Sequence, residues 1–531
     1  MTAAPPPTGP DEPGAAARIA AAYASDGPAV DLGSVVIAGQ PHPEAQVRLP
    51  LSMINRHGLI AGATGTGKTK TLQLIAEQLS AAGVPVVLAD LKGDLAGLVR
   101  PGQPGDRITR RAADSGDPWS ATGFPVEFLT LGGIGTGLPV RATITDFGPV
   151  LLSKVLDLNE TQESSLGLVF HYADGAGLPL LDVKDLRAVL TWLTSDDGKA
   201  DLKGLGGLSP ATAGVILREL IALEDLGGDV FFGEPAWEPA DLLRQAPDGR
   251  GVISAVELAA VQDRPALFST FLMWLLAELF EELPEVGDLD RPRLVFFLDE
   301  AHLLFTGASK AFLEAVTQTV RLIRSKGVGV FFVTQNPTDV PSSVLGQLGN
   351  RVQHALRSFT PEDADALRKT VRTFPKSADY DLGDLLPALG TGEAAVTVLS
   401  ERGAPTPVAW TMLRAPRSTM GAVDEQVRAD VVAASPLQSK YGVAVDRESA
   451  YERLAARLAP PAPPAPRETP APRPPGPPAP HRGRKAPQAE TGGVVAAVLG
   501  SSAFRAFARS AASALGREIS RGVFGTRRRR R

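Results

Sequence analysis

The chain has 531 residues, of which 44% are hydrophobic and 21% charged, and this composition excludes a protein that is disordered throughout. Cysteine is absent, which excludes disulfides and thiolate-bound metals, and the six histidines show no metal-ligand spacing. The net charge of −5 is no sign of nucleic-acid binding by itself, although the C-terminus is strongly basic. The N-terminus lacks the basic start and apolar run of a secretory signal, so we expect a cytoplasmic protein.

The N-terminal part of the chain predicts an arm followed by strands that alternate with helices. Residues 1–30 begin rich in proline and predict a disordered arm, and the stretch VDLGSVVIAG at residues 30–39 predicts a first strand. Residues 57–83 combine a short apolar run, a Gly-rich loop and apolar residues at helical spacing, which predicts strand, loop and helix. Uninterrupted apolar runs, typical of parallel strands buried on both faces, follow at 84–90, 293–300 and 327–335. Residues 31–414 are therefore predicted to form an α/β domain with a mainly parallel sheet.

Helical patterns interrupt this alternation in the middle of the chain. Residues 147–248 predict a helical insertion, after which 249–259 predict a strand that rejoins the sheet. The apolar run at 271–280 has about half the ~20 residues of a membrane span and contains Glu278, so we expect a buried helix. Alternating residues predict a closing hairpin at 393–400 and 407–413.

After residue 414 the sequence no longer shows the apolar runs of buried strands. Residues 415–458 predict a helical extension, and residues 459–490, with thirteen prolines in 32 positions, predict a disordered linker. Residues 491–531 predict a basic amphipathic helix that ends in an arginine tail. Such a helix suits DNA phosphates, an anionic membrane surface, a protein groove or the chain's own ring. Its apolar face, with Phe504 and Phe507, favours lipid or a protein groove over DNA.

The octapeptide GATGTGKT at residues 62–69 fits the Walker A pattern and predicts a nucleotide site. Glycines let the loop curl so that backbone N–H groups face the β-phosphate, Lys68 brings a cation to the β/γ oxygens, and the Thr69 hydroxyl can ligate Mg²⁺. The alternative is a chance Gly-rich turn, which the strand-loop-helix context disfavours. The residues expected to bind ATP are Gly62, Ala63, Thr64, Gly65, Thr66, Gly67, Lys68 and Thr69.

The segment LVFFLDEAH supplies the acids that a Walker A site requires. Asp299 ends an apolar run, as a Walker B carboxylate that binds Mg²⁺ would, and Glu300 follows at the position of a general base. The alternative is that both acids only cap the next helix. The apolar run and the Walker A motif in the same chain favour catalysis and therefore ATP hydrolysis.

The next strand ends in FFVTQNPTD, which places Gln335 at a strand tip. A polar side chain there can sense the γ-phosphate and report it to a moving element. The alternative is a turn residue before Asn336–Pro337.

Several arginines are candidates for a finger that reaches the nucleotide of a neighbouring subunit. Arg351 and Arg357 lie on or beside the next predicted strand, and we include both among the catalytic candidates. Arg321, Arg324 and Lys326 are further candidates, equally suited to a cationic helix C-terminus.

Together these motifs resemble the HerA–FtsK superfamily of P-loop ATPases, most closely its HerA-like helicase branch, over residues 35–414. The resemblance is carried by GLIAGATGTGKTKTLQLIAEQL, LADLKGDLAGL, LVFFLDEAHLLF and RLIRSKGVGVFFVTQNPTDVPSSVLGQLGNRVQHALR. It implies a RecA-like P-loop NTPase core that assembles into a hexameric ring and pumps double-stranded DNA. It assigns roles to Lys68 and Thr69 in Walker A, Asp299 and Glu300 in Walker B, Gln335 as sensor, Arg351 or Arg357 as finger, and Asp90 as the acid that ends the second strand.

The leading hypothesis is an ATP-hydrolysing ring motor, a homohexamer that uses ATP and Mg²⁺ to translocate double-stranded DNA through contacts with the phosphate backbone. Two alternatives stay open: a ring ATPase that remodels a partner other than DNA, and a nucleotide-gated scaffold that acts through the basic C-terminal helix. Lys92, in the loop DLKGDLAGL, is interpreted as a pore residue or as part of a surface turn.

Overall fold

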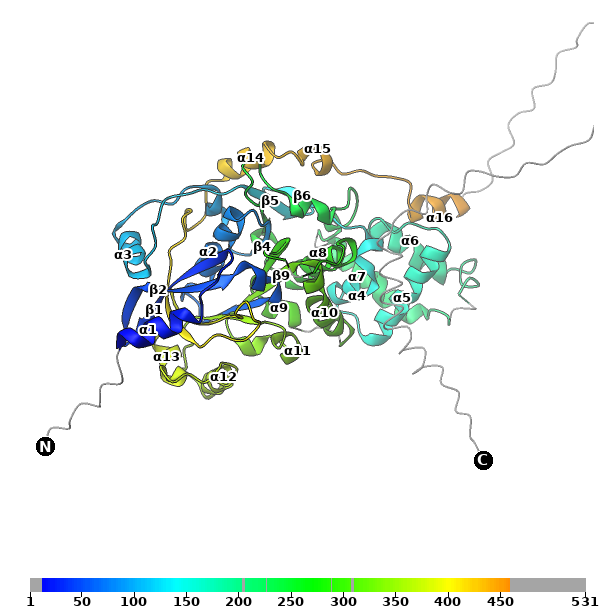
Figure 1. Cartoon of the computed structure of the whole chain (residues 1–531). Helices are drawn as coiled ribbons and strands as arrows, with labels where there is room; N and C mark the ends of the chain where they lie inside the picture. Colours follow the sequence, from blue (N-terminus) through cyan, green and yellow to red (C-terminus); the bar gives the residue numbers. More distant parts are fainter. Residues whose placement is uncertain (1–11, 203–205, 226, 288, 307–309, 459–531) are drawn as a thin grey trace, which may run out of the picture.

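The computed structural model describes residues 12–202, 206–225, 227–287, 289–306 and 310–458, and these form a 12-stranded sheet covered by helices (Figure 1). From one edge to the other, the strands are β2 (Gln40–Pro50), β1 (Ala29–Ile37), β12 (Ala409–Leu413), β11 (Glu393–Thr397), β10 (Asn350–Gln353), β3 (Gly58–Ala61), β9 (Val328–Thr334), β8 (Leu294–Leu298), β4 (Val86–Asp90), β7 (Ile253–Glu257), β5 (Val126–Leu131) and β6 (Leu138–Val140).

The sheet is mainly parallel, as predicted. Strands from β10 to β6 pair in parallel, whereas β2, β1, β12 and β11 pair antiparallel at the other side. The strand predicted at 249–259 is β7, and the predicted hairpin is β11 with β12. The strand β3, which precedes the Gly-rich loop, lies between β10 and β9, so the loop emerges from the interior of the sheet.

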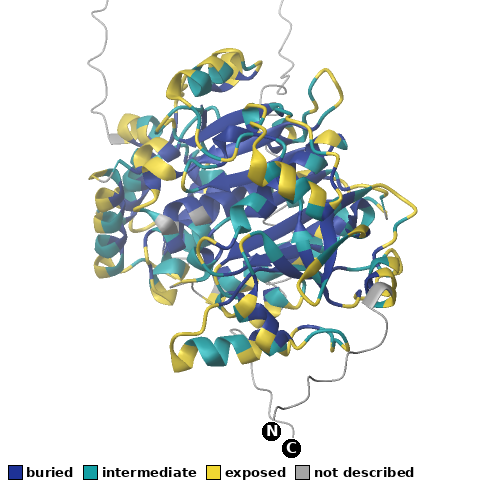
Figure 2. Cartoon of the chain, turned by 90° about the vertical axis from the view of Figure 1, so that its left-hand side faces the viewer, coloured by how far each residue is buried: buried dark blue, intermediate teal, exposed yellow. Residues whose placement is uncertain are grey.

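The apolar runs form strands because each of them faces a hydrophobic core on both sides. Along β8, Leu294, Phe296 and Leu298 belong to one core, whereas Val295 and Phe297 belong to the other. This alternation is the two-residue period of a strand. The strands formed by these apolar runs are therefore buried in the middle of the molecule (Figure 2). Exposed residues lie on the surrounding helices and loops and on the first half of the edge strand β2.

The α/β part of the chain carries helices on both faces of the sheet. They are α1 (Glu12–Ala21), α2 (Lys68–Ala81), α3 (Asp106–Ser115), α8 (Pro265–Glu282), α9 (His302–Phe305), α10 (Lys310–Ile323), α11 (Ser342–Leu345), α12 (Pro361–Val371) and α13 (Leu382–Ala388). Short 3₁₀ helices are η1 (Leu51–Arg56), η2 (Ala96–Val99), η3 (Asp229–Phe231), η4 (Pro239–Leu243), η5 (Ala259–Val261), η6 (Arg324–Lys326) and η7 (Pro337–Asp339).

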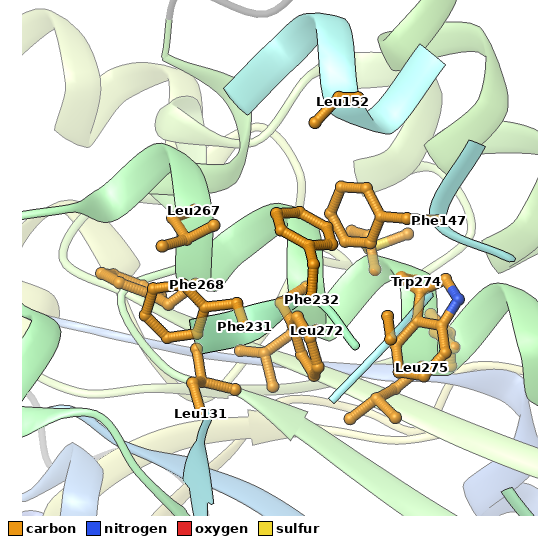
Figure 3. Close-up of a cluster of buried hydrophobic side chains, with 14 of the residues drawn as sticks. Leu131, Phe147, Leu152, Phe231, Phe232, Leu267, Phe268, Leu272, Trp274 and Leu275 are labelled. Carbon is orange, nitrogen blue, oxygen red and sulfur yellow. The ribbon is translucent and has the colours of Figure 1, made fainter. Parts of the chain in front are cut away.

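Between β6 and β7 the chain forms a group of helices on the right of Figure 1. They are α4 (Ile144–Val155), α5 (Glu160–Gly175), α6 (Val183–Thr194) and α7 (Pro210–Asp225). Within this part of the chain, Phe147 of α4 meets Phe232 edge-on at 5.2 Å (Figure 3). The ring of Phe147 also lies 6.2 Å from that of Phe271, which joins the group to α8. The helix α8 contains the run predicted as a buried helix, and its residues 271–276 are buried. Within the described ranges, no helix has the length and apolar character needed to cross a membrane.

The predicted disordered arm at 1–30 is wrong from Glu12 onward. Residues 12–21 form α1, and Ala16, Ile19 and Tyr23 are buried in the core beneath β1 and β2. The Tyr23 hydroxyl also donates to the carbonyl of Val396 at 2.8 Å. The segment is ordered because its few apolar residues lie at helical spacing and cover the antiparallel strands.

After β12 the chain crosses the molecule and returns to the helical group (Figure 1). This stretch carries α14 (Glu425–Ala433), α15 (Gln438–Tyr441) and α16 (Ala450–Leu458), and α16 packs against α6. The rings of Trp237 and Tyr441 stack at 4.2 Å and hold α15 in place. The predicted linker at 459–490 and basic helix at 491–531 lie outside the described residues.

Candidate functional site

The predicted Walker A loop joins β3 to α2 at the carboxyl edge of the parallel strands. The backbone N–H of Gly62 donates to the carbonyl of Thr334 at the end of β9, at 3.2 Å. The N–H of Ala63 donates to the carbonyl of Ala355, just beyond β10, at 2.8 Å. The loop is thus anchored to the chain at the ends of both strands that flank β3, which fixes its position relative to the sheet.

Two glycines of this loop have backbone conformations that exclude a side chain. Gly62 has a φ of 153°, and a Cβ there would lie 2.5 Å from the Cβ of His354. Gly67, the N-cap of α2, has a φ of 116°. Between them Thr64 and Gly65 are exposed. The crest of the loop is therefore open to a ligand directly before the N-terminal end of α2, where unpaired N–H groups and the helix dipole favour an anion.

Lys68 folds back over the loop that precedes it. Its ammonium donates to the carbonyls of Gly62 at 2.7 Å and Ala63 at 3.2 Å. Burial lowers the pKa of Lys68, and the negative charges of Glu300 and Asp299 oppose this effect. The predicted Walker A lysine and the predicted Walker B acids therefore share one electrostatic environment, although they lie more than 200 positions apart in the sequence.

Asp299 follows β8 at the same edge of the sheet. Burial raises its pKa to about 6, although the backbone N–H of Glu300 donates to its Oδ1 at 2.9 Å and favours the charged form. The positive charges of Lys68 and Lys92 also favour the charged form. A buried carboxylate in this environment gains stability from a bound cation.

The residues predicted to hold Mg²⁺ fit that ion chemically. Thr69 in the first turn of α2 and Asp299 beyond β8 offer a hydroxyl and a carboxylate oxygen, which are hard ligands of the kind Mg²⁺ prefers. In the part of the chain that the structure describes, no group of three or more His, Cys, Asp or Glu is arranged to hold a metal. One carboxylate and one hydroxyl, completed by substrate phosphates and water, are the usual arrangement for Mg²⁺ at a nucleotide.

Glu300 is almost fully buried in an unusual backbone conformation, with a φ of 47°. Its Oε1 accepts a hydrogen bond of 3.3 Å from the ammonium of Lys92, and its Oε2 lies 3.4 Å from Nδ1 of His302. Strained non-glycine residues of this kind are concentrated at functional sites. A residue that only capped the next helix would not need a partner from another strand. Glu300 has one, because Lys92 follows the neighbouring strand β4.

Gln335 directly follows β9 and is exposed, so it lies at a strand tip as predicted. It lines a surface cavity of about 470 Å³ with His302, Phe305, Thr306, Asn336 and Asp339. Asn336 also begins a capped 3₁₀ turn, η7, so both the sensor and the turn interpretation of this segment fit its geometry.

The two predicted finger arginines differ in their surroundings. Arg351, in β10, donates to the carbonyls of Thr373 at 3.0 Å and of Leu345 and Leu348 at 3.4 Å, and burial lowers its pKa. Arg357 is exposed on the loop after β10 and donates to the carbonyl of Pro387 at 2.5 Å. Of the two, Arg357 is the more exposed to solvent.

The remaining basic candidates lie at the opposite edge of the sheet. Arg321 is in the last turn of α10, and Arg324 and Lys326 form η6, directly before the amino end of β9. The helix-terminus interpretation of these residues therefore matches their positions, and they do not approach the Walker A loop of their own subunit.

Three residues that surround the loop were not singled out from the sequence for this role. His354, beyond β10, places Nε2 2.8 Å from Oγ1 of Thr71 in α2, and Gly392 donates its N–H to the carbonyl of Thr66 at 3.0 Å. Lys92 lies in the loop that follows Asp90, the last residue of β4. The sequence does place His354 near the end of a predicted strand. The neighbouring residues in the sequence, however, do not reveal that its partner is Thr71.

Comparison with known proteins identifies relatives of this chain. The model of a family described as Helicase HerA-like C-terminal matches residues 36–531. A protein of Methanocaldococcus jannaschii described as the probable helicase MJECL08 is 30% identical over 154 residues, which are 27% of this chain and 28% of that protein. The match thus spans less than a third of that relative.

Solved structures resemble the fold. The unbound bacterial conjugative coupling protein TrwBdeltaN70 has a TM-score of 0.50 and 16% sequence identity, and the match covers 77% of this chain and 93% of that chain. VirB4 of Thermoanaerobacter pseudethanolicus has a TM-score of 0.45 and 16% identity, covering 76% of this chain and 99% of that one. The first likeness supports the α/β fold alone.

Proposed function

Because the chain belongs to the HerA-like helicase C-terminal family, whose model matches residues 36–531, we propose that it is an ATP-hydrolysing ring motor that translocates double-stranded DNA. The family membership makes it a P-loop ATPase, which agrees with the resemblance drawn from its motifs. The ring, the DNA load and the roles of individual residues belong to the proposal.

The observation that carries the proposal is the placement of two sequence motifs at one edge of the sheet. The loop that contains Lys68 leaves β3, and Asp299 and Glu300 leave β8, two strands away across β9. Nucleotide hydrolysis needs a phosphate cradle, a metal ligand and a base within reach of one another. Parallel strands bring all three to the same edge.

Each residue then has a defined task. The exposed crest of the loop, at Thr64 and Gly65, and the first turn of α2 present backbone N–H groups to the phosphates. Lys68 exchanges its two carbonyl contacts for phosphate oxygens. Thr69 and Asp299 would hold Mg²⁺, which neutralises charge on the β- and γ-phosphates when bound. Glu300 accepts a proton from the attacking water.

Assembly would complete the site. Arg357 is exposed on the loop beyond β10, and we propose that it stabilises the transferring phosphoryl group in an adjacent subunit of a homohexamer. The description of one relative as a probable helicase supports nucleic acid as the load. Contacts to phosphates would make the binding independent of sequence and sensitive to salt.

The test combines sizing with ATP hydrolysis measured with and without a double-stranded DNA fragment. We expect rings, and hydrolysis that DNA stimulates with a steep loss as salt is raised. The Glu300→Gln variant should form the same rings and bind ATP, but hydrolyse it about 10²- to 10⁴-fold more slowly. If assembled rings hydrolyse ATP at the same rate with and without DNA, the protein is an ATPase but DNA is not the substrate that it moves.

A further inference from the structure

Lys92 contacts the carboxylate that we propose as the general base, although the mechanism above gives Lys92 no task. Its ammonium donates to Oε1 of Glu300 at 3.3 Å. The other oxygen, Oε2, is buried beside Nδ1 of His302 at 3.4 Å and accepts no hydrogen bond from the described residues. Oε1 of Glu300 is therefore paired with the Lys92 ammonium, and Oε2 is shielded from solvent.

The loop that carries Lys92 is rigidly built for this contact. Asp90 ends β4, and its carboxylate accepts hydrogen bonds from the backbone N–H groups of Lys92 at 3.3 Å, Asp94 at 3.2 Å and Leu95 at 2.9 Å. These bonds curl the chain immediately after the strand. Because β4 pairs in parallel with β8, the curled loop and Glu300 emerge side by side from the sheet.

This arrangement differs from that of a base ready to act. A general base must contact the water whose proton it accepts, directly or through one further water. Here Oε2 is closed to solvent and Oε1 is occupied by the Lys92 ammonium, so neither oxygen is placed to contact that water. The contact with Lys92 thus holds Glu300 away from the arrangement of an active base.

Of the two partners in this ion pair, only Lys92 is accessible to other ions in solution. The Lys92 side chain is 53% exposed, whereas that of Glu300 is 10% exposed. An anion that arrives from solvent can therefore pair with the ammonium but cannot reach the carboxylate. Phosphodiester groups of a translocated DNA duplex are anions of this kind, and lysine binds phosphate as a point charge.

We propose that Lys92 is a positioning residue that restrains Glu300, and that DNA phosphates release the restraint by competing for the Lys92 ammonium. This inference rests on the proposed ATPase and adds to it a link between the load and hydrolysis. Its consequence is that Lys92 keeps the rate low when DNA is absent.

The experiment measures kcat and KM for ATP in full-length Lys92→Met, Lys92→Arg and native proteins, with and without a double-stranded DNA fragment. Without DNA we expect kcat of Lys92→Met to rise roughly two- to fivefold, the factor that corresponds to a half-exposed ion pair, with KM unchanged. The ratio of the rates with and without DNA should fall toward one. Lys92→Arg should stay close to the native protein, because it keeps the cation.

Lys369→Met is the matched control, because it removes a lysine that pairs with Asp365 at 2.7 Å on α12, outside the site. It should change neither kcat nor the response to DNA. Thermal melting checks that the variants fold, and Lys92→Gln replaces Lys92→Met if the latter does not.

The outcomes separate this inference from the proposed function. A Lys92→Met or Lys92→Gln protein that is no faster than the native protein without DNA overturns the restraint, while the native ATPase stands. A faster variant combined with a native protein that DNA does not stimulate supports the restraint and overturns DNA as the competing anion. Absence of hydrolysis in every protein overturns the proposed function and the restraint with it.

Discussion

Nε2 of His354 lies 2.8 Å from Oγ1 of Thr71, so the chain beyond β10 is hydrogen-bonded to the first turn of the helix that follows the predicted Walker A loop. His354 also packs against Gly62 at the start of that loop. Burial, with a smaller contribution from the charge of Lys68, lowers its pKa to about 4. At neutral pH the ring is therefore uncharged, and it joins β10 to both ends of the loop.

Acid is expected to destabilise the chain through His354. Its pKa of about 4 in the folded state lies below the ordinary value of 6.5, so the unfolded chain binds more protons between these values. The free energy of unfolding should thus fall as the pH drops from about 6.5 to about 4, by about 3 kcal/mol for this residue alone. Urea unfolding of native and His354→Gln proteins at pH 7.5 and 4.5 measures the difference, and an equal loss in both would contradict the prediction.

The raised pKa of Asp299 should appear in the Mg²⁺ requirement. A carboxyl with a pKa of about 6 is protonated in mildly acidic solution and then cannot ligate the ion. We expect the Mg²⁺ concentration for half-maximal hydrolysis to rise about tenfold for each pH unit below 6 and to be level above pH 7. Titrations at pH 5.0, 6.0 and 7.5 test this. A requirement independent of pH would show that Asp299 is not the ligand.

Replacement of the two finger candidates should have different effects. Arg357→Ala is expected to lower kcat by about a thousandfold or more in assembled rings while ATP binding is retained, because arginine fingers act on the transition state. Arg351→Ala should instead lower the free energy of unfolding by about 1–3 kcal/mol, because three carbonyls of its own subunit lose their donor.

Mixed rings supply the control for action between subunits. Arg357→Ala and Glu300→Gln subunits are each inactive, but an interface formed by the intact Glu300 of one and the intact Arg357 of the other would be complete. We expect part of the activity to return on mixing. Mixtures as inactive as either variant would argue that Arg357 acts within its own subunit or not at all.

Much of the fold and the central site could be predicted because their signals are local. The octapeptide at 62–69 and the pair Asp299–Glu300 each occupy consecutive positions, and strands buried on both faces appear as apolar runs such as β8 and β9. The order of these strands in the sheet was not encoded locally.

The rest depended on contacts between distant segments. His354 and Thr71 are 283 positions apart, and Lys92 and Glu300 are 208 apart, so neither pair leaves a spacing that a sequence pattern can reveal. Arg351 and Arg357 were equal candidates in the sequence, and only their surroundings distinguish them. The N-terminal helix was missed because a segment rich in alanine, next to prolines and glycine, carries few apolar residues.

That N-terminal helix is expected to stabilise the fold. Ile19 in α1 is fully buried beside β1 and β2, so Ile19→Ala should lower the free energy of unfolding by about 2–4 kcal/mol through lost burial and a cavity. Arg18→Ala is the matched control, because Arg18 is exposed and its ion pair with Asp379 lies at the surface. Urea unfolding compares the two. Equal, small losses would mean that α1 contributes little to the core.

Glu77 joins the helix α2 to the segment after β12. Its buried carboxylate accepts hydrogen bonds from the backbone N–H groups of Arg417 at 2.7 Å and Ser418 at 3.0 Å, and from the Ser418 hydroxyl. Gln73, one turn earlier in α2, donates to the same hydroxyl at 2.7 Å. The helix that begins at the predicted nucleotide site is thus held by the segment after β12.

Disruption of this cluster should weaken both stability and ATP binding. Ser418→Ala removes one donor from a buried carboxylate and should cost about 1–3 kcal/mol of unfolding free energy. Glu77→Gln should cost more, because its amide N–H₂ would face backbone N–H donors. Thr419→Ala, the neighbouring residue with an exposed hydroxyl, should change little. If α2 transmits the change to the loop, KM for ATP should rise slightly in Ser418→Ala and more in Glu77→Gln. An unchanged KM in a destabilised Glu77→Gln protein would mean that the cluster stabilises the fold without affecting ATP binding.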